Sequence, residues 1–215
     1  MKQPFPKHVF VTGIGTGVGK TIVSAILTEA LQADYWKPVQ CGGLDNSDSK
    51  IVKSLLSNAV SKVHPETYAL KTASSPHYAA AQENTEVHLN HFQIPGTNNR
   101  LVIEGAGGLM VPLNKKHLVI DLIQYLNVPV VLVAKNYLGG INHSLLSTAV
   151  LKSRNMNLAG IIFNGPNYFD NEEIIQHFSG IPIIGRIGET KSITPKFIFE
   201  QAEKLKLYLS EYFEL

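Results

Sequence analysis

The sequence predicts an α/β fold, with a mostly parallel central sheet between two layers of helices (α/β/α), and three observations support it. Apolar runs such as residues 101–103 and 130–134 are continuous rather than alternating, which is typical of strands buried on both faces. Segments with apolar residues at helical spacing separate these runs. Polar and Gly-rich residues directly follow the runs, at the strand ends where open parallel sheets bind their ligands.

One domain is expected across residues 1–215. In chain order, the predicted strands are residues 9–11, 35–39, 101–103, 130–134, 158–163 and 181–184. The predicted helices are residues 21–31, 51–60, 118–126, 141–151, 172–178 and 195–213. Residues 61–99 carry turn dipeptides and short helical pieces but no strong core strand, so we expect them to form an insertion rather than a second domain.

The first half of this pattern has clear local signals. Residues 21–31 repeat apolar side chains every three or four positions, which predicts a helix. The strand at 35–39 ends in a polar, turn-rich loop, and the helix over 51–60 follows, with Asp48 or Ser49 near its N-cap. Residues before 61 therefore already predict the alternation of strands and helices that is typical of an α/β fold.

Composition excludes several classes of partner. The chain has 215 residues, 44% of them hydrophobic, a net charge of +2 and no block of like charges, which argues against nucleic acid and membrane surfaces as partners. The longest apolar run, residues 128–134, is too short to span a bilayer. A single cysteine and the lack of a signal-peptide pattern at the start predict a cytoplasmic protein.

Residues 13–21 read GIGTGVGKT, between the first predicted strand and the first predicted helix. Glycines in such a loop let backbone N–H groups converge on phosphate oxygens, and the helix dipole adds positive charge. Lys20 would reach the β- and γ-phosphates, and the Thr21 hydroxyl would bind Mg²⁺. A strand-helix turn that merely needs glycine explains some of the glycines, but not the Lys-Thr pair. The motif predicts a P-loop NTPase-like domain, with a loop one residue longer than the common spacing.

Two carboxylates are candidates to complete a Mg²⁺ site with Thr21. Glu104 ends the strand at 101–103, the position of a Walker B acid, although strand-end carboxylates are often merely solvated. Asp48 lies in the loop after the second strand; Asp45 competes with it, and Asp48 is equally suited to cap a helix.

Lys37 is a further candidate for chemistry. It lies in a Trp-Lys-Pro-Val sequence at the end of the second strand, where it either extends to solvent from an edge strand or points at the P-loop. In the second case two lysines, Lys20 and Lys37, would lie near one phosphate. That arrangement suits phosphoryl transfer to an anionic acceptor.

Six motifs at compatible spacing resemble those of the dethiobiotin synthetase family, in order along nearly the whole chain. They are GIGTGVGKT at 13–21, WKPV at 36–39, NSD at 46–48, SPH at 75–77, EGAGG at 104–108 and LGGINH at 138–143. The resemblance implies an ATP- and Mg²⁺-dependent ligase of biotin biosynthesis. Its substrates would be 7,8-diaminononanoate and CO₂, joined as a carbamate that is phosphorylated and closed to the ureido ring of dethiobiotin, with ADP and phosphate released.

The resemblance also implies roles for individual residues and a homodimer whose second subunit completes the substrate site. The catalytic residues would be Lys37 and Lys20, and the Mg²⁺ ligands Thr21, Asp48 and Glu104. The nucleotide would contact Gly17, Val18, Gly19, Lys20, Thr21, Ile22, Asp48, Glu104, Gly105, Ala106, Gly107, Asn164, Gly165, Gly188, Glu189 and Thr190. The substrate would contact Thr16, Cys41, Leu138, Gly139, Gly140 and Asn142.

Three positions depart from the family pattern. Gly15 stands where Asp or Asn is common, and Cys41 where Ser or Thr contacts the diamine, and a thiol is the poorer hydrogen-bonding group. Gly165 stands where an aspartate often helps to read the base, so other triphosphates than ATP remain open as substrates.

Two alternatives share this fold. One is a nucleotide switch of the chromosome- or septum-positioning class, which usually carries a lysine early in the P-loop, where this chain has Gly15. The other is the synthetase domain of a cobyrinate amidotransferase, which would normally bring a glutaminase domain for which 215 residues leave no length.

Overall fold

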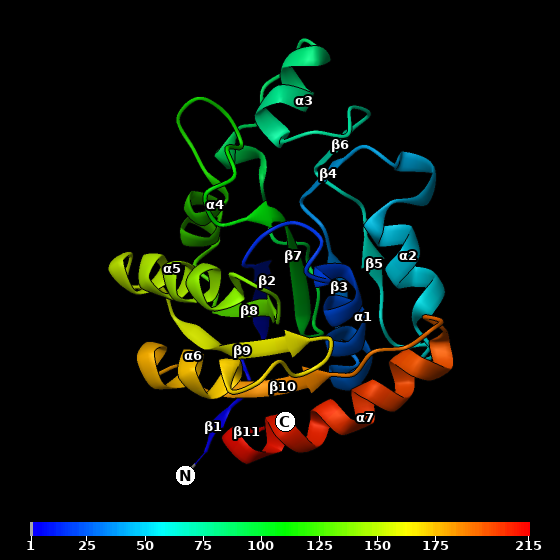
Figure 1. Cartoon of the computed structure of the whole chain (residues 1–215). Coiled ribbons are helices and arrows are strands. Elements are labelled where there is room, and N and C mark those ends of the chain that lie inside the picture. The colour runs from blue at the N-terminus through cyan, green and yellow to red at the C-terminus, as the bar shows by residue number, and fades with distance from the viewer. Residues whose placement is uncertain (1) are drawn as a thin grey trace.

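The computed structural model describes residues 2–215 and consists of three layers (Figure 1). Seven strands form the central sheet in the order β10-β9-β8-β2-β7-β3-β5, and every neighbouring pair is parallel. They are β2 (His8–Gly13), β3 (Asp34–Trp36), β5 (Val63–His64), β7 (Leu101–Gly108), β8 (Val130–Lys135), β9 (Leu158–Asn164) and β10 (Ile183–Ile187). The predicted fold class is confirmed. The chain places β3, β5 and β7 on one side of β2 and then crosses to place β8, β9 and β10 on the other side, and ligands bind at the carboxyl ends of strands where the strand order reverses in this way.

Helices cover both faces of the sheet. On one face lie α1 (Lys20–Leu31), α2 (Asp48–Leu55) and α7 (Pro195–Tyr212), and on the other α4 (Val119–Leu126), α5 (Gly140–Ser153) and α6 (Asn171–Ser179). Ile26 and Leu27 of α1 are fully buried in the same cluster as Leu205 of α7. Burial of each such side chain stabilises the fold by about 1.5–3 kcal/mol. The apolar residues whose spacing predicted these helices therefore form the helix faces that pack against the sheet.

The predicted strand at 35–39 is two strands. β3 ends at Trp36, and β4 (Val39–Cys41) pairs instead with β6 (Tyr68–Leu70) in a separate two-stranded sheet. Pro38 lies between β3 and β4; it has no N–H to donate to a ladder, and its carbonyl accepts from Tyr68 N. The interruption lets the chain leave the central sheet directly after Lys37.

Residues 61–99, where no strong core strand was expected, contribute one short strand to the central sheet. β5 is the edge strand of the central sheet, paired with β3, but at two residues it is too short to produce a sequence pattern. The rest of the segment holds β6, α3 (Pro76–Gln82) and a 3₁₀ turn at Leu89–His91, and α3 lies above the carboxyl edge of the sheet in Figure 1. That residues 61–99 form an insertion in one domain stays a prediction.

The remaining differences lie at element ends. α2 begins at Asp48 rather than residue 51, after a 3₁₀ turn at Leu44–Asn46, and β7 continues through Gly108, past its predicted end at residue 103. At the chain termini β1 (Gln3–Pro4) pairs with β11 (Phe213–Glu214). Among residues 2–215, each helix is either too short or too polar to cross a membrane.

Candidate active site

The loop between β2 and α1 has the geometry of an anion-binding turn. Gly17 and Gly19 take left-handed conformations with φ of 74° and 91°, and Gly19 is the N-cap of α1. A Cβ at Gly19 would lie 2.0 Å from Asn164 Nδ2, so this position requires glycine for both its conformation and its close contact. The free N–H groups of the first turn of α1 therefore point toward the carboxyl edge of the sheet.

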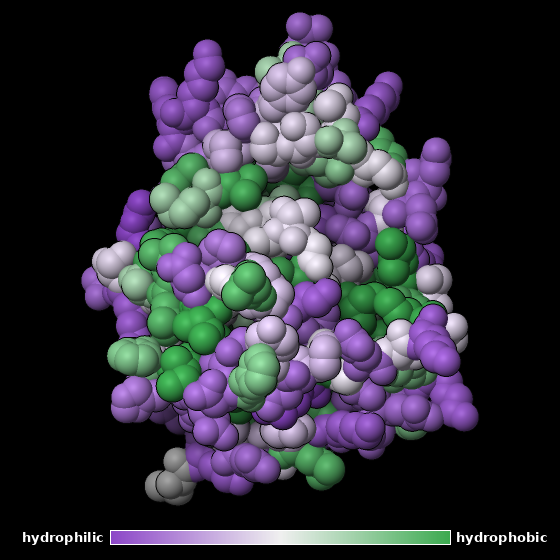
Figure 2. Space-filling view, in the orientation of Figure 1, coloured by the Kyte–Doolittle hydropathy of each residue, from purple (hydrophilic) through white to green (hydrophobic). Residues whose placement is uncertain are grey.

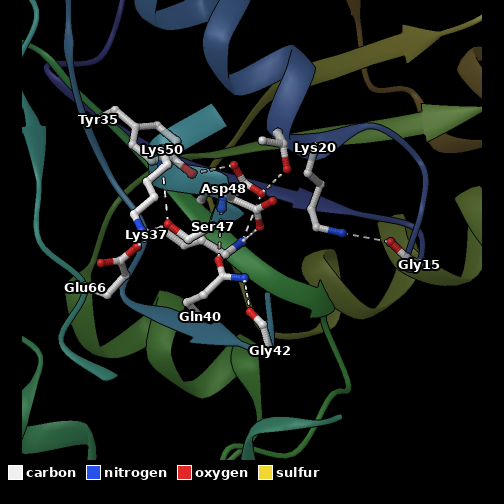
Figure 3. A network of polar contacts seen from close by, with 12 residues as sticks. Gly15, Lys20, Tyr35, Lys37, Gln40, Gly42, Ser47, Asp48, Lys50 and Glu66 are labelled. Atoms are coloured by element: carbon white, nitrogen blue, oxygen red, sulfur yellow. Dashed lines mark hydrogen bonds and ion pairs between the residues drawn. The ribbon is translucent and has the colours of Figure 1, made fainter. Parts of the chain in front are cut away.

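Lys20 is buried at the start of α1. Its Nζ donates to the Gly15 carbonyl at 2.9 Å, so the side chain folds back over the loop (Figure 3). Burial lowers the pKa of Lys20 to about 8; the nearby Lys37 adds to this effect, and Glu104 opposes it. A bound phosphate would supply the counter-charge that the buried ammonium lacks.

Glu104 is the centre of a polar network at the carboxyl edge. It is 1% exposed, and its Oε1 accepts from Thr21 Oγ1 at 2.9 Å and from Lys37 Nζ at 3.0 Å, while Oε2 accepts from Tyr35 OH at 2.7 Å. Burial and Glu104 raise the pKa of the Tyr35 hydroxyl well above its usual value. Sequence reasoning missed Tyr35, because one tyrosine in a three-residue strand belongs to no motif.

Lys37 points at the P-loop side of the sheet rather than out to solvent. Its Nζ lies 2.7 Å from Asp48 Oδ2 and 3.0 Å from Glu104 Oε1 (Figure 3). Burial by itself lowers the pKa of Lys37, but the two carboxylates outweigh burial and the pKa is raised. The residue is therefore a fixed ammonium ion between two carboxylates.

Asp48 is the first residue of α2 and does not cap it. Ser47 is the N-cap and accepts from Lys50 N, so the interpretation of Asp48 as a cap is wrong. Gln40 holds this turn: its Nε2 donates to the Gly42 carbonyl at 2.9 Å, and its Oε1 accepts from Asp48 N at 3.3 Å. Sequence reasoning missed Gln40, because a single amide at a strand end belongs to no motif.

A cavity of about 690 Å³ opens between the P-loop, β4 and the start of α3. The predicted site residues that line it are Thr16, Gly17, Gly19, Lys20, Thr21, Ile22, Lys37, Cys41, Asp48, Glu104, Ala106 and Gly107. Val39, Ala73, Ser74, Ser75, Pro76 and Val111 also line it and had no predicted role. Burial raises the pKa of the Cys41 thiol to about 11, so the thiol is neutral near neutral pH. Asp45, the competing carboxylate, is not among the lining residues.

Two predicted nucleotide contacts, Val18 and Gly105, lie behind the wall of this cavity. The Val18 side chain is buried in the core, and its carbonyl accepts from Asn164 Nδ2 at 2.9 Å. Gly105 is packed so closely that a Cβ there would lie 2.6 Å from the Phe10 ring. Backbone groups of these residues, rather than side chains, are what a ligand would meet.

A second cavity of about 130 Å³ adjoins the first, and Ile22 lines both. Besides Ile22, five predicted residues line it, namely Asn164, Gly165, Gly188, Glu189 and Thr190, together with Lys135, Ile187, Ile193 and Phe197, which had no predicted role. Because Asn164 Nδ2 is bonded to the P-loop, its Oδ1 is left to accept from a ligand. We call this second cavity the Asn164 pocket.

The predicted substrate segment at 138–142 lies elsewhere. Gly139 is the N-cap of α5, and Leu138 before it is 93% exposed. Among residues 2–215, those lining the two cavities include none of Leu138, Gly139, Gly140 and Asn142. Within one copy of the chain, the structure does not bring this segment to the site.

The oxygen atoms of Thr21, Asp48 and Glu104 fit the chemistry of Mg²⁺. Hydroxyl and carboxylate oxygens are the ligands that this ion prefers. Thr21 contacts Glu104 directly, and Lys37 joins Glu104 to Asp48, so the three side chains face one part of the large cavity.

Comparison with known proteins identifies the family. A family model described as an AAA domain matches residues 7–196. The ATP-dependent dethiobiotin synthetase BioD of Cytophaga hutchinsonii is 49% identical over 200 residues, which cover 93% of this chain and 97% of that protein. The protein of the same name from Christiangramia forsetii is 48% identical over 206 residues, with 96% and 99% covered. The chain belongs to the dethiobiotin synthetase family.

Comparison with solved structures shows other proteins that share this fold. A ParA family ATPase from Chlorobium tepidum matches with a TM-score of 0.56 and 14% identity, over 96% of both chains. The MinD cell division protein of Aquifex aeolicus matches with a TM-score of 0.53 and 13% identity, over 95% of both chains. At this identity the likeness concerns the fold alone: these two proteins share the architecture of this dethiobiotin synthetase family member, and the sequence comparison decides the family.

Proposed function

We propose that the chain is an ATP- and Mg²⁺-dependent dethiobiotin synthetase that acts on 7,8-diaminononanoate and CO₂. The observation that carries the proposal is the position of Lys37. Its ammonium group lies between Glu104 and Asp48, in one cavity with Lys20 and Thr21. A family membership at 49% identity over nearly the full length supports the same activity.

The P-loop and its surroundings bind the triphosphate in this proposal. Backbone N–H groups from Gly17 to Ile22 surround the phosphates, and Lys20 leaves the Gly15 carbonyl to contact the γ-phosphate. Thr21, Asp48 and Glu104 would hold Mg²⁺, which would offset the negative charge of the phosphates.

The chemistry forms two C–N bonds at the cost of one ATP. One amine of the diamine attacks CO₂ and loses a proton to give a carbamate. A carbamate oxygen attacks the γ-phosphorus and ADP leaves. The second amine then attacks the activated carbon and loses a proton, and phosphate leaves as the ring closes. Negative charge develops on the carbamate and on the transferred group, where Lys37 and Lys20 stabilise it in a buried site.

A second copy of the chain would complete the substrate site. Leu138, Met110 and Leu146 are more than half exposed, and Leu146 and Met110 line a cavity of about 350 Å³ against the outer side of the P-loop. Hydrophobic residues gather over α4 and α5 in Figure 2. A homodimer that covers this face would bring residues 138–142 of one copy near the cavity of the other. Such an enzyme, with its single thiol, fits the cytoplasm.

The test uses purified protein with ATP, Mg²⁺, bicarbonate and 7,8-diaminononanoate. We expect phosphate release that depends on the diamine, and a product whose mass is that of dethiobiotin. Phosphate release that is the same without the diamine would refute the proposal.

Lys37→Ala tests the residue that carries the proposal. We expect ATP binding to persist and kcat to fall by about 100–1000-fold, the loss seen when one preorganised donor to a transition state is removed. Lys50→Ala is the matched control, because Lys50 is an exposed lysine that only bonds the carbonyls of the nearby 44–45 turn. Wild-type turnover in Lys37→Ala would remove Lys37 from the mechanism.

A further inference from the structure

Two loops form part of the wall of the Asn164 pocket, and each contributes a glycine to it. Asn164 is the last residue of β9, and one loop continues from it through Gly165; the other loop follows β10 and contains Gly188. Since glycines present only backbone to a ligand, the shape of the pocket depends on where each loop backbone lies. The contacts that hold these loops in place would therefore affect which nucleobase the pocket binds.

The loop after β9 is held from outside the pocket. The Pro166 carbonyl accepts from Asn136 Nδ2 at 3.1 Å, and the same nitrogen donates to Glu172 Oε1 at 2.8 Å. Arg186 donates to the other oxygen of Glu172. Asn136 follows β8, Arg186 lies in β10 and Glu172 is in the first turn of α6, so the contacts tie together the carboxyl ends of three neighbouring strands (Figure 1).

The charge of Glu172 fixes the direction of this contact. The residue is 2% exposed, and a buried carboxylate is retained only where partners compensate for its lost hydration. An ionised carboxylate accepts and never donates, so it draws the NH₂ group of Asn136, and the same NH₂ group reaches the Pro166 carbonyl. If the amide turned over, its oxygen would face two acceptors.

We infer that Glu172 is a positioning residue for nucleobase selection: through Asn136 it holds the Pro166 end of the loop that carries Asn164 and Gly165. The inference rests on the proposed nucleotide site. Glu172 contacts no ligand itself; it sets the backbone against which Asn164 Oδ1 accepts from a base amino group. Loss of the contact lets the loop move and weakens the difference between bases that carry an amino group there and those that carry a carbonyl.

The experiment compares Glu172→Gln, Asn136→Ala and their double variant with wild type. Dissociation constants for ATP, CTP and GTP are measured by calorimetry, with KM and kcat for ATP in parallel. We expect both single variants to weaken ATP binding about tenfold, as loss of a hydrogen bond to a charged group does. The preference for ATP over GTP should shrink, and kcat should stay within about twofold of wild type. The double variant should be no weaker than either single variant, because the two residues act in series.

A matched control separates positioning from general stability. Glu29 is another buried carboxylate that anchors a loop, through Ser57 and Asn58, at the far end of α1 from the P-loop. Glu29→Gln should lower the melting temperature but leave all three dissociation constants unchanged. Unchanged base preference in Glu172→Gln and Asn136→Ala, or a loss that Glu29→Gln reproduces, would overturn the inference. If wild-type phosphate release proves independent of the diamine while the base preference still shifts, the proposed function fails and this inference stands.

Discussion

Asp34 and Glu104 are both carboxylates that are 1% exposed, and they lie in adjacent strands, Asp34 at the amino end of β3 and Glu104 within β7, level with the carboxyl end of β3. Asp34 begins β3 and is paired in register with Leu101 of β7, three residues before Glu104. The donors around Asp34 are Lys62 N, Thr97 Oγ1, Asn99 Nδ2 and His64 Nε2, at 2.8–3.2 Å. The donors to Glu104 are the hydroxyls of Tyr35 and Thr21 and the ammonium of Lys37.

The difference lies in what the donors do besides bonding the carboxylate. Those of Asp34 belong to residues 62–99, so this carboxylate anchors the connection between β5 and β7 to the amino end of the sheet. Two donors of Glu104, Thr21 and Lys37, line the large cavity and are within reach of a ligand. The two carboxylates are equally buried, but Asp34 holds a chain connection in place and the donors of Glu104 face the cavity. Their positions along the sheet account for this difference.

Glu104→Gln should give the largest effect. The variant keeps the size of the side chain but removes the charge proposed to hold Mg²⁺ and to orient Lys37. We expect kcat to fall by about 100–1000-fold. The free energy of unfolding should fall by only about 1 kcal/mol, because the Tyr35 and Thr21 hydroxyls can turn to accept from the amide and Asp48 still pairs with Lys37. Phosphate release over a Mg²⁺ titration and urea unfolding measure the two quantities. Turnover near that of wild type would place Glu104 with Asp34 as a structural carboxylate.

Asp34→Asn should give the reverse result. The substitution replaces one acceptor oxygen by an NH₂ group that faces donors. We expect the free energy of unfolding to fall by about 2 kcal/mol and kcat to stay within about twofold of wild type. Urea unfolding and the same turnover assay check this. A loss of turnover without a loss of stability would contradict the separation of the two edges.

The smallest expected effect concerns the pH dependence of stability, and it tests the role of Asp34 most specifically. Burial by itself raises the pKa of Asp34, but its hydrogen bonds, first that from Lys62 N, outweigh burial and hold the pKa below its usual value. A lowered folded-state pKa adds stability above the unfolded value of about 4, and this stability is lost as the pH falls through the folded value. Unfolding in urea near pH 7 and near pH 3.5 should therefore show a steeper acid loss in wild type than in Asp34→Asn. Equal slopes would mean that Asp34 is not specifically stabilised in the folded state.

Local sequence signals were sufficient for much of the fold. The helical spacing of residues 21–31 and the continuous apolar runs were enough to predict the layers of a parallel sheet, because both signals come from burial over a few neighbouring positions. They were not sufficient for β5, which is too short for a pattern, or for the break at Pro38 between β3 and β4. Pairing with β6 decides that break, and β6 lies about thirty residues further along the chain.

The candidate site likewise has one part that local sequence predicts and one part that depends on the tertiary structure. The P-loop is encoded locally, since glycine conformation, the helix start and the Lys-Thr pair lie within nine consecutive residues, and the sequence by itself determined it. Only the tertiary structure decided that Lys37 faces Glu104, 67 positions away, and that Thr21 bonds the same carboxylate across 83 positions. The order in which strands pair brings these side chains together, and no spacing within the sequence records that order. The anchors at Gln40, Asn136 and Glu172 depend on it for the same reason.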